Sequence, residues 1–189
     1  MKTLILYSSR DGQTKKIAYF IAQQLQQISP QKEVVIEKLE QKSAVDFQNI
    51  SCVIIGASIR YGHFESKLYA FIQRYAAQLN QIPSAFFSVN LTARKAGKDS
   101  PETNVYTRKL LQKISWQPTY KAVFAGALYY PRYNFFDRIM IQFIMRLTGG
   151  ETDTSKEIEY TDWGKVKEFA ELIDGRKKNS GNLSSSQSS

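Results

Sequence analysis

The sequence predicts an α/β fold in which a five-stranded parallel sheet is covered by helices on both faces. Short apolar runs alternate with helical patterns along the chain, as expected for strand–helix–strand units. Three of the runs carry apolar residues at successive positions, which is typical of strands buried on both faces. The connections are short, and this favours the doubly wound strand order 2-1-3-4-5.

Composition and periodicity place the individual elements. Apolar runs of strand length predict strands at residues 3–7, 34–39, 52–57, 85–89 and 122–128. Apolar residues at helical spacing predict helices at 14–28, 68–79, about 102–114, and from near Asp162. The elements form one domain over residues 1–174, and the basic, serine-rich tail at 175–189 is expected to be disordered.

A segment at about residues 129–153 does not fit a minimal five-stranded unit. It interrupts the fifth strand, whose second half is expected at 157–160. Its helical pattern places Arg138, Gln142 and Arg146 opposite an apolar stripe. The stripe consists of Phe136, Ile139, Met140, Phe143, Ile144 and Leu147. Such a helix either packs on the protein's own core or faces a membrane surface or a quinone.

Composition excludes several classes of protein. With one cysteine, Cys52, and one histidine, His63, the chain cannot build a disulfide framework, and no metal site is expected. Cys52 is expected to be a small core residue. The N-terminus shows no secretory signal, and no apolar run is long enough to span a bilayer. The net charge of +9 attracts polyanions, but no RNA-reading motif is visible, so nucleic acid is not an expected partner.

The first strand leads into a candidate phosphate loop. Backbone N–H groups and the dipole of the following helix favour an anion there, and glycine allows close approach. The loop matches neither the triphosphate nor the dinucleotide motif. The alternative is a plain strand–turn–helix with Thr14 as the N-cap. The candidate residues are Ser9, Arg10, Asp11, Gly12, Gln13 and Thr14.

Two further strand ends lie beside the expected switch point, where open α/β sheets bind ligands. Their aromatic and amide side chains suit a flat heterocycle that is covered on its faces and hydrogen-bonded at its edge. The residues are Ser58, Arg60, Tyr61 and Gly62 after the third strand, and Ser88, Val89, Asn90 and Leu91 at the end of the fourth.

Five stretches resemble the flavodoxin-like, quinone-dependent protoporphyrinogen IX dehydrogenases of bacterial haem synthesis. They are residues 9–14, 54–63, 88–91, 125–133 and 149–154, and the Gly-Gly-Glu-Thr-Asp end of the insertion is the most specific. The resemblance implies one FMN, oxidation of protoporphyrinogen IX, and electron delivery to ubiquinone or menaquinone. It also implies a peripheral enzyme on the cytoplasmic face of the bacterial inner membrane. The oligomeric state stays open, including a homo-oligomer.

Such a substrate is apolar apart from two propionates, which arginine binds well. Arg60 and Arg132 are the best candidates for this contact, and His63 is the candidate for proton transfer near neutral pH. Each also has a plain interpretation, as a surface cation or a loop histidine. Two other functions on this fold are an NAD(P)H:quinone reductase and a flavodoxin-type electron carrier, although a carrier needs neither the insertion nor a substrate pocket.

Overall fold

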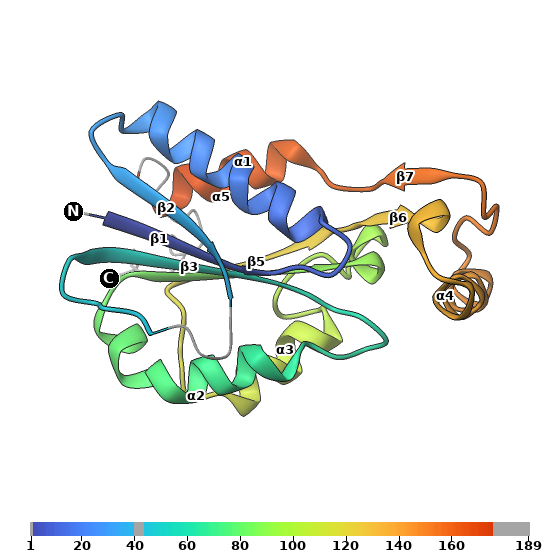
Figure 1. Cartoon of the computed structure of the whole chain (residues 1–189), viewed down its shortest axis with the longest axis horizontal. Coiled ribbons are helices and arrows are strands. Elements are labelled where there is room, and N and C mark those ends of the chain that lie inside the picture. The colour runs from blue at the N-terminus through green and yellow to red at the C-terminus, as the bar shows by residue number, and fades with distance from the viewer. Residues whose placement is uncertain (1, 40–43, 176–189) are drawn as a thin grey trace, which may run out of the picture.

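A computed structural model of the chain describes residues 2–39 and 44–175 (Figure 1). The expected tail lies outside these residues, apart from Gly175. The main sheet is fully parallel, with the order β2-β1-β3-β4-β5, so the predicted strand order is confirmed. Its strands are β1 (Lys2–Ser8), β2 (Glu33–Lys38), β3 (Ile50–Ser58), β4 (Ser84–Asn90) and β5 (Tyr120–Ala125).

Helices cover both faces of this sheet (Figure 1). On one face lie α1 (Gln13–Ile28) and α5 (Trp163–Ile173), and on the other lie α2 (Ser66–Gln81) and α3 (Val105–Lys113). Because side chains alternate along a strand, successive residues of β1 enter different cores. Ile5 packs in the core under α1 and α5, whereas Leu4 and Leu6 pack in the core under α2.

One glycine is required by close packing in the centre of the sheet. A Cβ built on Gly56 of β3 would lie 2.0 Å from Cζ of Phe87 in β4. The Phe87 ring therefore packs directly over the Gly56 backbone, and it also contacts the rings of Phe124 and Phe169. This arrangement fills the core between the sheet and α5.

The fifth strand differs from the expectation of a single run at 122–128. β5 ends at Ala125, and the chain continues as β6 (Ala127–Tyr129), which pairs antiparallel with β7 (Glu157–Glu159) in a separate ribbon. The physical reason is that β4 ends at Asn90 and turns into the short helix η1 (Leu91–Arg94). Beyond that point β6 has no neighbour in the main sheet, so its backbone groups pair with β7.

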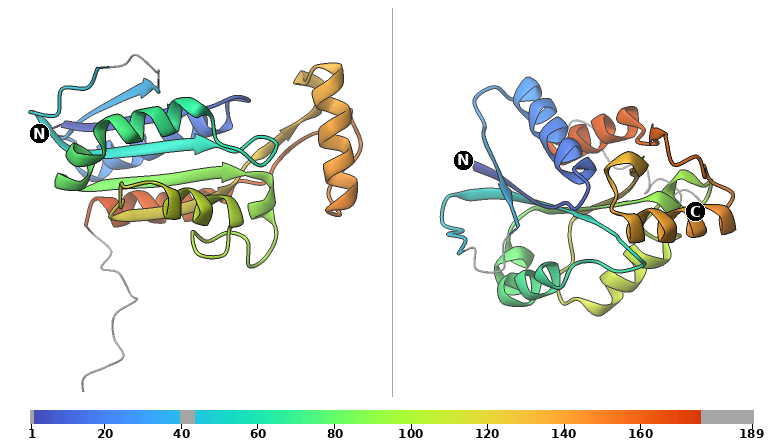
Figure 2. Two further views of the ribbon diagram at one scale, coloured as in Figure 1. Left: turned by 90° about the horizontal axis from the view of Figure 1, so that it is seen from below. Right: turned by 45° about the vertical axis from the view of Figure 1, so that its right-hand side comes forward.

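The ribbon carries the insertion, which consists of η2 (Tyr130–Arg132) and α4 (Phe135–Leu147). Figure 2 shows α4 standing across the end of the domain, away from the other helices. Only Ile141 and Met145 of this helix are buried. The apolar stripe is exposed instead, from 38% at Ile144 to 79% at Phe136, so it does not pack on the protein's own core. Within the described residues, no helix is both long and apolar enough to cross a membrane.

Candidate functional site

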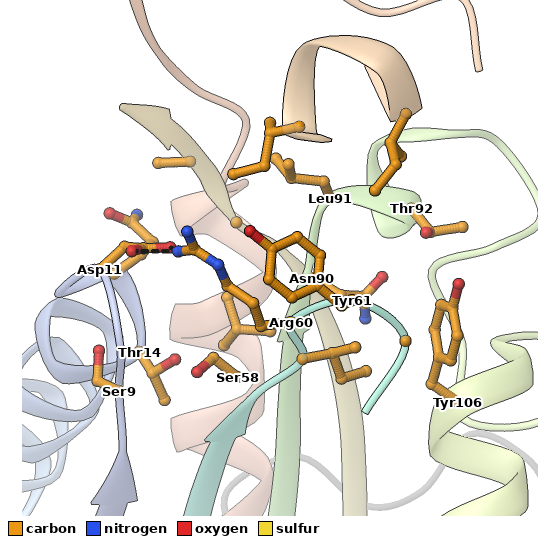
Figure 3. A pocket seen from close by; sticks show the side chains of 18 of the residues that line it. Ser9, Asp11, Thr14, Ser58, Arg60, Tyr61, Asn90, Leu91, Thr92 and Tyr106 are labelled. Carbon is orange, nitrogen blue, oxygen red and sulfur yellow. Dashed lines mark hydrogen bonds and ion pairs between the residues drawn. The ribbon is translucent and has the colours of Figure 1, made fainter. Parts of the chain in front are cut away.

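A cavity of about 460 Å³ lies where β1, β3 and β4 end. The loops after these strands form one side, and α4 forms the other. Figure 3 shows Ser9, Thr14 and Ser58 grouped near the start of α1, with Tyr106 across the opening. Eleven of the expected residues line the cavity, namely Ser9, Asp11, Gln13, Thr14, Ser58, Arg60, Tyr61, Gly62, Val89, Asn90 and Leu91.

The loop after β1 has the geometry of an anion site. Gly12 adopts a left-handed φ of 92° and precedes α1 as its N-cap, a conformation that glycine adopts at no steric cost. The hydroxyl of Ser9 accepts a hydrogen bond from the Gly12 N–H at 3.1 Å. Thr14 is therefore not the N-cap. Its Oγ1 is buried and finds no hydrogen-bond partner in the described part of the chain.

Gln13 ties this loop to the ribbon and to the start of α5. Its Nε2 donates to Oγ1 of Thr161 at 2.8 Å, and its Oε1 accepts from the hydroxyl of Tyr129 at 2.7 Å. The side chain is 5% exposed. Gln13 is thus used in positioning the loop against β6.

Arg60, after β3, connects the anion loop to the insertion. Its Nη1 lies 2.6 and 2.7 Å from the two carboxylate oxygens of Asp11 (Figure 3), and its Nη2 lies 2.6 Å from Oδ2 of Asp137 in α4. The guanidinium also lies 5.0 Å from the Tyr133 ring centroid, within the range of a cation–π contact. Burial opposes the charge, but Asp11, Tyr61 and Asp137 together raise the pKa of Arg60, which stays protonated.

A tight turn presents the aromatic side of the cavity. The backbone groups of Arg60 and His63 exchange two hydrogen bonds of 3.0 Å, and the residues between them, Tyr61 and Gly62, have φ values of 50° and 81°. Positive φ at both central positions defines a type I′ turn. Tyrosine rarely adopts this conformation, and such backbone strain occurs often at binding sites. Tyr106 of α3 packs beside Gly62, 3.4 Å from where a Cβ would lie.

The end of β4 supplies an amide with a free donor. Oδ1 of Asn90 accepts from the N–H of Ala93 at 3.0 Å and from Nδ2 of Asn104 at 3.2 Å. Its Nδ2 is buried and has no partner among residues 2–39 and 44–175. Ser88 lies further down the strand. Its hydroxyl is 2.7 Å from that of Thr107 in α3, so this side chain faces the helix and not the cavity.

Five of the expected site residues do not line the cavity, namely Arg10, Gly12, His63, Ser88 and Arg132. His63 is exposed at the end of the turn. Arg132 is 61% exposed, bonds Glu157 at 2.8 Å and lies over the ring of Tyr129. Their proposed chemical roles stay predictions.

Sequence reasoning missed the far wall of the cavity. Its residues include Tyr106 of α3 and four of α4, namely Met140, Ile141, Ile144 and Met145. Met140 and Ile144 belong to the predicted apolar stripe, for which a quinone-facing role is one of the expected alternatives, but the sequence pattern does not indicate which edge of the stripe lines the cavity. The other lining residues outside the prediction are Ile59, Thr92, Gly126, Ala127 and Tyr133.

The polar atoms of the cavity fit a ligand with acceptors at both ends. Thr14 Oγ1, Arg60 Nε and Asn90 Nδ2 are all buried, can all donate, and lack a partner among the residues described. Buried polar groups are normally satisfied, so three such donors in one cavity indicate a missing acceptor. A ligand with acceptor groups near Thr14 and near Asn90 would satisfy these donors.

Comparison with known proteins agrees with this geometry. Residues 4–155 match the flavodoxin domain family. Protoporphyrinogen IX dehydrogenase [quinone] of Escherichia coli K12 is 51% identical over 174 residues, which cover 92% of this chain and 94% of that protein. The protein of the same name from Leishmania major is 53% identical, over 89% of this chain and 73% of its own length.

Solved structures support the fold alone, because their sequences are distant. A short-chain flavodoxin associated with a bacterial microcompartment superposes with a TM-score of 0.53 at 10% identity, over 93% of this chain and 98% of that one. A flavodoxin from the domain Archaea gives 0.50 at 16% identity, over 92% and 99%. The fold and the matching domain imply a flavin cofactor.

Proposed function

Because the chain belongs to the flavodoxin domain family, and within it to the quinone-dependent protoporphyrinogen IX dehydrogenases, we propose that it oxidises protoporphyrinogen IX to protoporphyrin IX. The cofactor is FMN, and the electrons pass to ubiquinone or menaquinone. The observation that carries the proposal is the cavity at the strand ends, which combines unsatisfied donors with an apolar wall from the insertion.

Residues from three strand ends and from α3 would hold the FMN. The hydroxyls of Ser9 and Thr14 and the first N–H groups of α1 would bind its phosphate. Asn90 Nδ2 would donate to a carbonyl at the edge of the ring, and Tyr61 and Tyr106 offer aromatic faces. Bound FMN supplies the redox chemistry by accepting hydride equivalents from the porphyrinogen and releasing electrons to the quinone.

The protein's own residues then bind and orient the macrocycle. Met140, Ile141 and Ile144 present apolar surface to it, and Arg60 supplies a permanent positive charge for a propionate. Arg132 of η2 lies outside the cavity wall. It would therefore bind a second propionate that projects out of the cavity. His63 is our candidate for passing protons to solvent, because it is exposed beside the turn that carries Tyr61.

Anaerobic mixing tests the reaction directly. FMN-loaded protein is mixed with protoporphyrinogen IX while flavin absorbance and porphyrin fluorescence are followed. We expect the flavin band to bleach as porphyrin fluorescence rises, and a quinone analogue to restore the flavin band. A flavin that is reduced rapidly by NADPH but not by porphyrinogen would contradict the proposal and favour an NAD(P)H:quinone reductase.

We also propose that α4 places the enzyme on the cytoplasmic face of the bacterial inner membrane as a peripheral protein. Phe135, Phe136, Phe143 and Leu147 are 58–79% exposed on this helix. Several large apolar side chains that are exposed together commonly mark an interaction site. Arg146 is exposed in the last turn, where an anionic headgroup would contribute about 1 kcal/mol.

Vesicle flotation tests this surface. Phe136→Asp with Phe143→Asp should abolish flotation with anionic vesicles. Tyr19→Asp is the control, because Tyr19 is an aromatic residue that is 50% exposed on α1, outside the insertion. Retained flotation of the double variant would reject the membrane role, and a sedimentation coefficient that falls in the double variant would indicate that a second copy covers α4 instead.

A further inference from the structure

Asp137 joins α4 to the opposite wall of the cavity. It lies in the first turn of the helix, and its Oδ2 is 2.6 Å from Arg60 Nη2. Its other oxygen accepts a hydrogen bond from the hydroxyl of Tyr61. Both oxygens are therefore used, and the side chain is only 18% exposed. Asp137 is also the single acidic residue of α4.

The cavity is too small for both molecules of the proposed reaction. Its volume of about 460 Å³ lies in the lower part of the range of about 300–1,000 Å³ that encloses a single drug-sized ligand. FMN and a tetrapyrrole must nevertheless meet for electrons to pass between them. Met140, Ile141, Ile144 and Met145 form the wall on the α4 side, so an outward movement of this wall would enlarge the cavity for the macrocycle.

The attachment of α4 makes such a movement feasible. The helix buries only Ile141 and Met145, and it is carried by a ribbon of two three-residue strands (Figure 2). Arg60, in contrast, is held in the turn after β3 by two backbone hydrogen bonds to His63, and it keeps Asp11 of the anion loop as a second partner. When a new carboxylate approaches Arg60, Asp137 is displaced more easily than Asp11, because Asp137 lies on the weakly attached α4.

We infer that Asp137 is a specificity-determining residue that occupies, on Arg60, the place taken by a carboxylate of the substrate. The entering carboxylate displaces Asp137, and its release lets α4 move outward. The inference rests on the proposed function, which supplies a substrate with carboxylates. Tetrapyrroles whose carboxylates are esterified would not displace Asp137.

Porphyrin binding to the FMN-loaded protein tests this exchange. The probes are protoporphyrin IX and its dimethyl ester, followed by fluorescence. Asp137→Asn should tighten binding of the diacid about fivefold, the upper range for a part-exposed ion pair, and leave the ester unchanged. The control is Asp153→Asn, which removes the same charge shortly after α4, where Asp153 pairs with Lys156 and lies outside the cavity wall.

Hydrogen exchange over residues 135–147 provides a second readout that needs no activity. The diacid should accelerate exchange in the wild-type protein, whereas the ester should not. Tyr61→Phe removes one bond to Asp137 without changing any charge, so it should accelerate exchange even without porphyrin. This experiment decides the question if Asp137→Asn does not fold.

The outcomes separate the two proposals. If the diacid binds but Asp137→Asn tightens neither porphyrin, or both equally, and the diacid leaves exchange in α4 unchanged, the exchange mechanism is overturned while the proposed reaction stands. If neither porphyrin binds and porphyrinogen does not reduce the flavin, the proposed function is wrong and the inference is overturned with it.

Discussion

Thr14→Val should have opposite effects on the apoprotein and on FMN binding. Valine keeps the branched shape of threonine but removes Oγ1, which is buried without a partner in the described chain. In the apoprotein an unsatisfied buried hydroxyl costs about 1–3 kcal/mol, so its removal should leave the free energy of unfolding unchanged or raise it by about 1 kcal/mol. In the complex, the variant loses a hydrogen bond to a charged phosphate, worth about 1.5–3 kcal/mol.

This loss corresponds to a Kd for FMN that is about 10- to 150-fold higher. The assay is titration of apoprotein with FMN, followed by quenching of flavin fluorescence, with urea unfolding of the same samples. Riboflavin is the control ligand, because it has the same ring without the phosphate, and its Kd should not change. An unchanged Kd for FMN, or an equal loss for riboflavin, would refute the assignment of Thr14 to the phosphate.

Three other predictions concern the core, the thiol and the ribbon. Gly56→Ala should lower the free energy of unfolding, measured by urea titration, by about 1–3 kcal/mol through overpacking against Phe87. Adding Phe87→Leu to this variant should recover part of the lost stability. A Gly56→Ala variant as stable as the wild type would contradict this packing. Burial raises the pKa of Cys52 to about 11, so the unfolded thiol ionises first and stability should fall as the pH rises from about 9 to 11, by up to about 2–3 kcal/mol. In Cys52→Ala, the free energy of unfolding should not show this fall between about pH 9 and 11. A pH dependence identical to that of the wild type would refute the assignment to Cys52. Arg132→Gln should raise the KM for porphyrinogen if Arg132 binds a propionate, whereas Glu157→Gln, which breaks the same ion pair, should not; equal KM values in both variants and wild type would remove Arg132 from substrate binding.

The strand order was predictable because buried parallel strands leave a strong local signal. The runs around Leu6, Ile55 and Phe86 carry apolar residues at three or more successive positions, and the short connections allow few topologies. The break after Ala125 was not predictable, because it depends on where β4 ends. A strand that outruns its neighbour must find another partner, and the apolar run at 122–128 gives no sign of this.

The candidate site was predictable where it follows strand ends and not where it depends on distant pairs. Asp11, Arg60 and Asp137 meet although they are far apart in the sequence, and single charges carry no periodicity that reveals their partners. Ser88 illustrates a different limit. Side chains two residues apart share a face of a strand, so Ser88 and Asn90 both point toward α3, but Ser88 lies deeper and is covered by Thr107.

The exposure of Met140 and Ile144 on two sides affects how a lipid-soluble molecule would reach the flavin. Both side chains line the cavity, and both are also open to the outside, at 48% and 38%. A lipid-soluble molecule bound to the outer side of α4 would therefore need to pass only these two side chains to enter the cavity. Along this path it would stay in contact with apolar side chains and would not cross bulk water.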